Sequence, residues 1–138
     1  MAPPATPAPI DPAAEADQLV DLFNNLSQAL DAFRLADHVP PIATDELARL
    51  KDDAQALEDC AHYFTAQAIG ATLQSIQPDL ANIKAVTAQA KTQLGKLNDI
   101  SKVISIGASA LSLGTAIAAG NPASIAAAAT ALTQTLAV

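Results

Sequence analysis

The 138-residue sequence contains no tryptophan, one tyrosine, three phenylalanines and one cysteine. A single cysteine, Cys60, cannot form a disulfide within the chain, so the fold does not depend on an oxidising compartment. The scarcity of aromatic side chains leaves no row of stacking platforms for bases or sugar rings. Basic residues are also few: seven Lys and Arg stand against fourteen Asp and Glu, which gives a net charge of −7. This balance argues against nucleic acid as a partner, because phosphate binding needs clustered Lys and Arg.

Common catalytic patterns are missing as well. No serine lies in a GxSxG turn, no glycine-rich loop joins a strand to a helix, and one cysteine with two histidines is too few for a zinc site. The best metal-ligand candidate is Glu58 with His62, four residues apart on one helix face, with Cys60 between them. A metal would need further ligands from other helices. We therefore expect a surface pair beside a packed thiol, no metal, no cofactor and no enzymatic activity.

The first twelve residues, MAPPATPAPIDP, contain five prolines. Proline blocks helix formation and the segment has little to bury, so we predict a disordered Pro/Ala tail over residues 1–11. It has neither the basic nor the apolar region of a secretory signal peptide. We expect a cytoplasmic protein, or one exported without a cleaved N-terminal signal.

Residues 12–138 are predicted to form one all-α domain, an antiparallel bundle of four helices, or of five if the third one breaks. Alanine is abundant, and apolar residues recur at spacings of three and four. Asp11-Pro12 starts the first helix, and Thr44 is expected to cap the second. Gly95 and Asp99 mark the expected break, and Gly120-Asn121-Pro122 is a helix end followed by a helix start. The predicted helices cover residues 12–37, 44–76, 79–119 (with a break near 95–99) and 122–137.

Charge is divided unevenly along the chain. Twelve of the fourteen acids precede Pro78, whereas four of the seven bases follow it. The second predicted helix carries a candidate acidic interaction face, made of Asp45, Glu46, Asp52, Asp53, Glu58 and Asp59. With no catalytic pattern present, this face favours a non-enzymatic protein that acts by binding an unidentified protein partner.

The last stretch, Val103–Val138, contains no charged side chain. Its large apolar residues form two stripes joined by a tight turn, which predicts a helical hairpin. The hairpin seam consists of Ile106, Leu113, Ile117, Ile125, Leu132 and Leu136. Because Ala, Ser and Thr occupy the other positions, the pattern favours a hairpin buried in a bundle.

Membrane insertion of residues 103–138 is the alternative hypothesis. Each arm would be about 25 Å long, at the short end for crossing a bilayer. Small residues at Ala110, Gly114 and Ala118 have the spacing that lets membrane helices approach closely. Self-association is compatible with either hypothesis, since alanine seams pack closely.

Two further stripes run along the third predicted helix. Its heptad continues beyond the expected break through Ser101, Ile104, Ala108 and Leu111. Serines form a polar stripe at Ser101, Ser105, Ser109 and Ser112. The serine stripe fits either a close-approach surface for another helix or a face turned to solvent.

The uncharged, Ala/Gly/Ser-rich hairpin at Val103–Val138 resembles the tongue of α-helical pore-forming toxins, over about a quarter of the chain. That resemblance rests on composition and implies a membrane-active protein that inserts this hairpin. The Ala-rich amphipathic helices are also similar to those of phasins, which coat polymer granules.

Overall fold

The computed structural model describes residues 11–38, 41–97 and 99–137. These residues form helices connected by short turns and contain no strand, which confirms the all-α prediction. Of the predicted tail, only Asp11 lies within the described residues. The helices are α1 (Pro12–Leu35), α2 (Thr44–Tyr63), α3 (Ala66–Ser75), α4 (Gln77–Leu94), α5 (Ile100–Ala119) and α6 (Pro122–Ala137).

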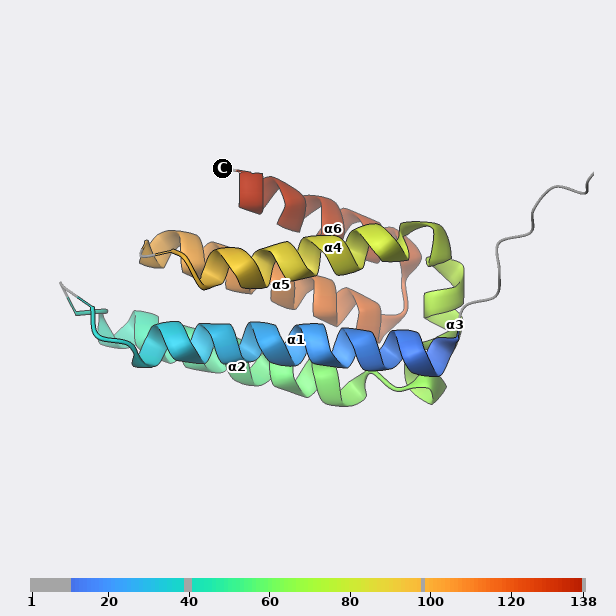
Figure 1. Cartoon of the computed structure of the whole chain (residues 1–138), viewed down its shortest axis with the longest axis horizontal. Coiled ribbons are helices and arrows are strands. Elements are labelled where there is room, and N and C mark those ends of the chain that lie inside the picture. Colours follow the sequence, from blue (N-terminus) through green and yellow to red (C-terminus); the bar gives the residue numbers. More distant parts are fainter. Residues whose placement is uncertain (1–10, 39–40, 98, 138) are drawn as a thin grey trace, which may run out of the picture.

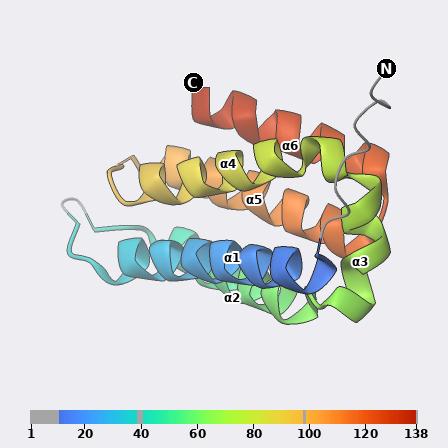
Figure 2. The ribbon, with the colours of Figure 1, turned by 45° about the vertical axis from the view of Figure 1, so that its right-hand side comes forward.

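The five long helices form a layered bundle (Figure 1). One layer holds α1 and α2, the next holds α4 and α5, and α6 covers the outer side of α4 and α5. The short α3 crosses one end of the bundle and carries the chain from the first layer to the second (Figure 2). Consecutive long helices run antiparallel, whereas α1 with α4 and α2 with α5 run in the same direction across the layers.

The first helix begins as predicted but ends two residues early. The Asp11 carboxylate accepts hydrogen bonds from the backbone N–H groups of Ala13 and Ala14, at 3.1 and 3.4 Å. At the other end, Ala36 has an extended backbone. The His38 ring lies 2.6 Å, by its Nε2 atom, from the carbonyl oxygen of Phe33 and so occupies an acceptor that the helix leaves free.

The prediction of one helix over residues 44–76 was wrong, because the chain breaks at Phe64–Thr65. Phe64 turns into the core, where its ring packs edge to face against the Phe23 ring, with 5.1 Å between the ring centroids. Thr65 then caps α3, accepting a hydrogen bond from the Ala68 N–H at 3.1 Å. Burial of a large ring together with a side-chain cap outweighs the continuing helical pattern.

The predicted cap at Thr44 was also wrong. The cap position is Ala43, which has an extended backbone and no side-chain oxygen to offer. Thr44 is the first helical residue, followed by Asp45 and Glu46 in the first turn. The two acids lie at the positive end of the helix dipole and stabilise the helix start without a side-chain cap.

The break expected near residues 95–99 is confirmed. The fourth helix begins at Gln77, two residues before the predicted start, and ends at Leu94. Asp99 starts α5 by accepting a hydrogen bond from the Ser101 N–H at 3.0 Å. The turn between α5 and α6 also matches expectation: Gly120 is left-handed, with φ 78°, and Asn121 caps α6 through the N–H groups of Ala123 and Ser124.

The central element of the bundle is α5, which contacts each of the other five helices. Two glycines allow this close approach. A Cβ atom on Gly114 would lie only 2.8 Å from the Phe23 ring, and one on Gly107 would lie 3.2 Å from a Leu30 methyl carbon. The small residues of this helix therefore make room for large side chains of α1 within the bundle core.

The end of α6 is fastened to the second layer by side chains of α4 and α5. The Lys102 ammonium group donates a hydrogen bond to the Thr135 carbonyl oxygen at 2.7 Å. The Gln93 amide donates to the Leu136 carbonyl oxygen at 3.1 Å. A positive charge at a helix C-terminus is favourable because the last carbonyl groups carry partial negative charge.

Candidate functional site

Two apolar stripes run along α5, and the core covers only one of them. The first stripe is fully buried and consists of Val103, Ile106, Ala110, Leu113 and Ile117. The second stripe lies on the side next to α2 and is half-buried: Ile104, Ala108 and Leu111. This second stripe is the heptad continued from α4, and because α4 ends at Leu94 the stripe lies outside the central seam.

The uncovered stripe forms the floor of a shallow groove beside α2, which we name the α2–α5 groove. Its first section has a volume of about 460 Å³ and is lined by Asp45, Glu46, Arg49, Ser101 and Ile104. Its second section has a volume of about 640 Å³ and is lined by Arg49, Asp53, Ala108, Leu111, Ser112, Thr115, Ala116, Ala119 and Ser124. Because Arg49 borders both sections, they follow one another along the same pair of helices.

The predicted acidic face is divided by the geometry of α2. Asp45, Glu46 and Asp53 line the groove. Asp52 and Asp59 are exposed and, at about 100° of rotation per residue, lie on the side of α2 nearest to Asp45. Glu58 is exposed about 140° around the helix from Asp53 and does not belong to this face.

Asp53 is the least satisfied polar residue of the groove. Its Oδ2 atom is buried and has no hydrogen-bond partner within the part of the chain that the structure describes. That oxygen lies against α5, since a Cβ atom on Gly107 would be 3.7 Å from it. Burial raises the pKa of the Asp53 carboxyl group, the Arg49 charge lowers it, and the Asp52 charge raises it further. Asp53 thus lines the groove while one of its carboxylate oxygens is turned against α5, where the chain itself covers it.

All six residues of the predicted hairpin seam lie in the core. The exposed fraction is 0% for Ile106, Leu113, Ile117, Ile125 and Leu132 and 7% for Leu136. The two arms pack against each other as α5 and α6. Of the serine stripe, Ser101 and Ser112 line the groove, while the Ser109 hydroxyl lies 3.0 Å from the Thr135 hydroxyl on α6.

The predicted metal-ligand candidates do not converge. Glu58 and His62 are exposed, and Cys60 is half-buried. Over the described ranges, no group of three or more His, Cys, Asp or Glu side chains is placed to hold a metal ion. Burial raises the pKa of the Cys60 thiol. A hydrogen bond with Thr115 lowers this pKa and the Asp59 charge raises it, so with a raised pKa the thiol is a weak nucleophile at neutral pH.

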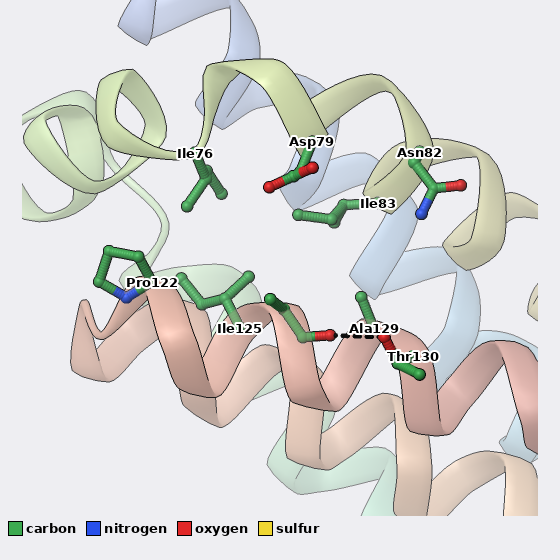
Figure 3. A pocket seen from close by; sticks show the side chains of 9 residues that line it. Ile76, Asp79, Asn82, Ile83, Pro122, Ile125, Ala129 and Thr130 are labelled. Carbon is green, nitrogen blue, oxygen red and sulfur yellow. Dashed lines mark hydrogen bonds between the residues drawn. The ribbon is translucent and has the colours of Figure 1, made fainter.

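A smaller cavity lies between the first turns of α4 and α6 (Figure 3). Asp79 and Asn82 reach it from α4, while Ile125 and Ala129 face it from α6. Its volume is about 120 Å³. That is well below the roughly 300–1,000 Å³ of typical ligand pockets, so the α2–α5 groove is the stronger candidate.

One helix among the described residues, α5, is long and apolar enough to cross a membrane. In its most apolar 18-residue window, 44% is buried inside the bundle. Comparison with known proteins finds no family model, curated protein or solved structure that matches this chain.

The groove floor was missed as a site in the sequence because its residues were interpreted only as the continuing heptad of the third predicted helix. The signal was present: α5 has apolar residues in two phases, Ile106–Leu113–Ile117 and Ile104–Ala108–Leu111. A helix with two apolar sides needs a cover for each of them.

Proposed function

We propose that this protein is a non-enzymatic binding module that holds a segment of a partner protein in the α2–α5 groove. The observation that carries the proposal is the second apolar stripe of α5, which stays half-buried while the rest of the core is closed. Burial of apolar surface drives association, and a stripe next to a charged wall provides both affinity and selectivity.

The groove walls support the same proposal. Asp45, Glu46 and Asp53 place negative charge along one side of an apolar floor. Interfaces of this kind combine an apolar centre with a polar rim. The described part of the groove contains no nucleophile beside a base, so we assign it to binding and not to catalysis.

A photo-crosslinking experiment tests the proposed function. A benzoylphenylalanine residue is introduced at Ser112 in the groove, and in a matched control at Thr92, an exposed hydroxyl residue on α4. Both variants are expressed as full-length chains in cells of the source organism and irradiated. We expect a defined adduct at Ser112 and none at Thr92.

The mass of the adduct and the crosslinked peptide identify the segment that occupies the groove. Absence of any adduct at Ser112, with a folded protein by circular dichroism, would overturn the proposal. An adduct of equal yield at Thr92 would also overturn it, because contact would then not be confined to the groove.

Membrane insertion of the α5–α6 hairpin is a second candidate function, favoured by the length and apolar character of α5. Insertion would have to withdraw α5 from contact with α1, α2, α3 and α4 and uncover Phe23 and Leu30. Release of this helix therefore has a large free-energy cost unless the lipid compensates for it.

Flotation with liposomes tests this second candidate. The purified protein is mixed with vesicles of phosphatidylcholine, alone or with phosphatidylglycerol, at pH 7 and pH 5. A binding module is expected to stay in the dense fraction under all four conditions. Flotation accompanied by leakage of an entrapped dye would favour the membrane function instead.

A further inference from the structure

The α2–α5 groove also defines the kind of segment that fits it, an inference that rests on the proposed function. Its floor runs from Ser101 to Ala119 along one helix, a distance of about 27 Å. An α-helix of about five turns has the same length. The helices α2 and α5 run in the same direction (Figure 1). A groove along them matches a straight rod better than a folded loop.

The groove walls favour a helix over an extended strand. Strand addition requires a sheet edge with free backbone N–H and C=O groups, and the described residues form no sheet. The helices α2 and α5 use their backbone groups internally, so recognition has to come from side chains. Small residues at Ala108, Ser112, Thr115 and Ala119 leave room for a partner backbone to approach closely, while Leu111 adds apolar contact.

The two sides of the groove differ in charge. On the α2 side lie Asp45, Glu46 and Asp53, with Arg49 as the single positive group among the lining residues. On the other side, α6 contains no charged residue from Pro122 to Ala137. Lys or Arg side chains on the occupant carry the charge opposite to that of these three acids.

A second copy of this chain fits the groove poorly. Each copy has a net charge of −7, so association would bring more negative charge to an acidic wall. On α4, the lysine-bearing helix, Lys84 is already engaged with Glu15 at 2.7 Å. The chemistry of the groove points to a different, basic chain.

We propose that the α2–α5 groove binds an amphipathic helix of a partner protein, with Lys or Arg along the flank facing α2 and small apolar residues against α5. Its basic residues lie opposite Asp45, Glu46 and Asp53. Its apolar face covers the second stripe of α5.

Selection from a random library tests the inference without knowledge of the partner. Phage displaying random 18-residue peptides are selected on the full-length protein and counter-selected on Ser112→Trp, which fills the groove. Thr92→Trp on α4 serves as the matched control. We expect enriched peptides with a net positive charge, apolar residues at helical spacing, and binding to Thr92→Trp but not to Ser112→Trp.

Affinities of synthetic peptides, measured by fluorescence anisotropy, test the role of Asp53. We expect Asp53→Asn to weaken binding about tenfold, because one of the three acids opposite the basic flank of the peptide loses its charge. The control Asp17→Asn, on an exposed acid of α1, is expected to change affinity less than about twofold. Circular dichroism establishes that each variant is folded.

Four results would overturn the inference. Enriched peptides that are neutral or acidic, or unchanged affinity for Asp53→Asn, would remove the basic helix as the occupant. A selection that enriches no peptide would do the same. A dimer in sedimentation equilibrium that Ser112→Trp dissociates would make a second copy the occupant. In each case, a partner protein crosslinked at Ser112 would still support the proposed function. Absence of that adduct would overturn both the inference and the proposed function.

Discussion

The first layer of the bundle and the layers above it differ in the size and charge of their side chains. In α1 and α2, large side chains such as Phe23, Leu30 and Leu57 fill the core, and the outer surface is strongly acidic. In α5 and α6, glycine and alanine line much of the contact surface, and the exposed positions carry Ala, Ser and Thr. The large residues of one layer occupy the space that the small residues of the other leave open.

This difference teaches that an uncharged segment does not have to be a membrane segment. Glycine and alanine on α5 receive the side chains of α1, so the helix needs little bulk of its own. The remaining mismatch between the layers is the half-buried stripe of α5 beside acidic α2. The α2–α5 groove lies at this border because the acidic layer does not extend far enough to cover the stripe.

The largest expected effect comes from a charge placed in the shared core. Leu113→Asp buries a carboxylate at a site with 0% exposure, and we expect it to lower the free energy of unfolding by more than about 4 kcal/mol. Circular dichroism and urea denaturation measure this loss. The control Ser105→Asp, exposed on the same helix, should stay within about 0.5 kcal/mol of wild type.

The alternative outcome for Leu113→Asp is specific to a membrane hairpin. A variant that keeps its helical spectrum and thermal transition but no longer binds liposomes would show that α5 does not depend on the bundle.

The fit between the layers is tested next by paired glycine substitutions. Gly114→Ala is expected to destabilise the protein by about 1–2 kcal/mol, since its Cβ atom would meet the Phe23 ring at 2.8 Å. In Gly107→Ala, the new Cβ atom would lie 3.2 Å from a Leu30 methyl carbon. The gain of about 1 kcal/mol in helix propensity should offset this contact and leave the free energy of unfolding near that of wild type. Urea denaturation of both variants gives the comparison; equal values would show that the ring contact does not limit the approach.

Asp53→Asn is expected to act in the opposite direction. Removing a half-buried, unpaired charge should raise the free energy of unfolding at pH 7 by up to about 1 kcal/mol. A raised folded-state pKa means that the folded protein holds this proton more tightly than the unfolded chain. Wild type therefore loses stability relative to the variant as the pH rises from the ordinary value of 3.8 through the raised pKa of Asp53.

Chemical denaturation of both proteins between pH 3 and pH 8 measures this difference. It should vanish at the acidic end and reach a plateau above the folded-state pKa. A loss of stability in Asp53→Asn at pH 7 would contradict the assignment of Asp53 as an unpaired group. Higher stability combined with weaker peptide binding is the pattern expected of a residue kept for function.

The smallest effect concerns the ion pair that joins the layers. Lys84 on α4 lies 2.7 Å from Glu15 on α1 and also donates to the Gln18 side chain at 2.8 Å. A double-mutant cycle with Lys84→Met and Glu15→Gln should give a coupling of about 0.5–1 kcal/mol that falls with added salt. The matched cycle of Lys84→Met with Asp17→Asn, which removes an exposed acid, should give a coupling near zero.

Local signals in the sequence located most helix ends. Asp11-Pro12, Asp99 and the Gly120-Asn121-Pro122 turn all act where their chemistry predicts. Such signals are readable because a cap or a left-handed glycine depends on neighbours a few residues away. Thr44 failed as a cap because the helix starts one residue earlier than the hydroxyl requires, and several start positions have similar free energy.

The break at Phe64–Thr65 depends on a distant residue. The helical periodicity of the sequence continues through this point. The contact with the Phe23 ring on α1 is what stabilises Phe64 in the core. The acidic face also depends on distant residues. Spacing along α2 shows that Glu58 and Asp53 lie on different sides of the helix, but only the position of α5 makes Asp45, Glu46 and Asp53 groove residues.

The sequence by itself determined the helical class, the antiparallel course of successive long helices, the turn at Gly120 and the two apolar phases of α5. These features follow from interactions within a few turns of one helix, where periodicity and capping dominate. Only the tertiary structure decided how far the second phase is covered, because Gly107 and Gly114 receive Leu30 and Phe23 of α1 and so fix how α5 lies in the bundle. The stripe beside Asp53 is left half-covered, and the α2–α5 groove lies there.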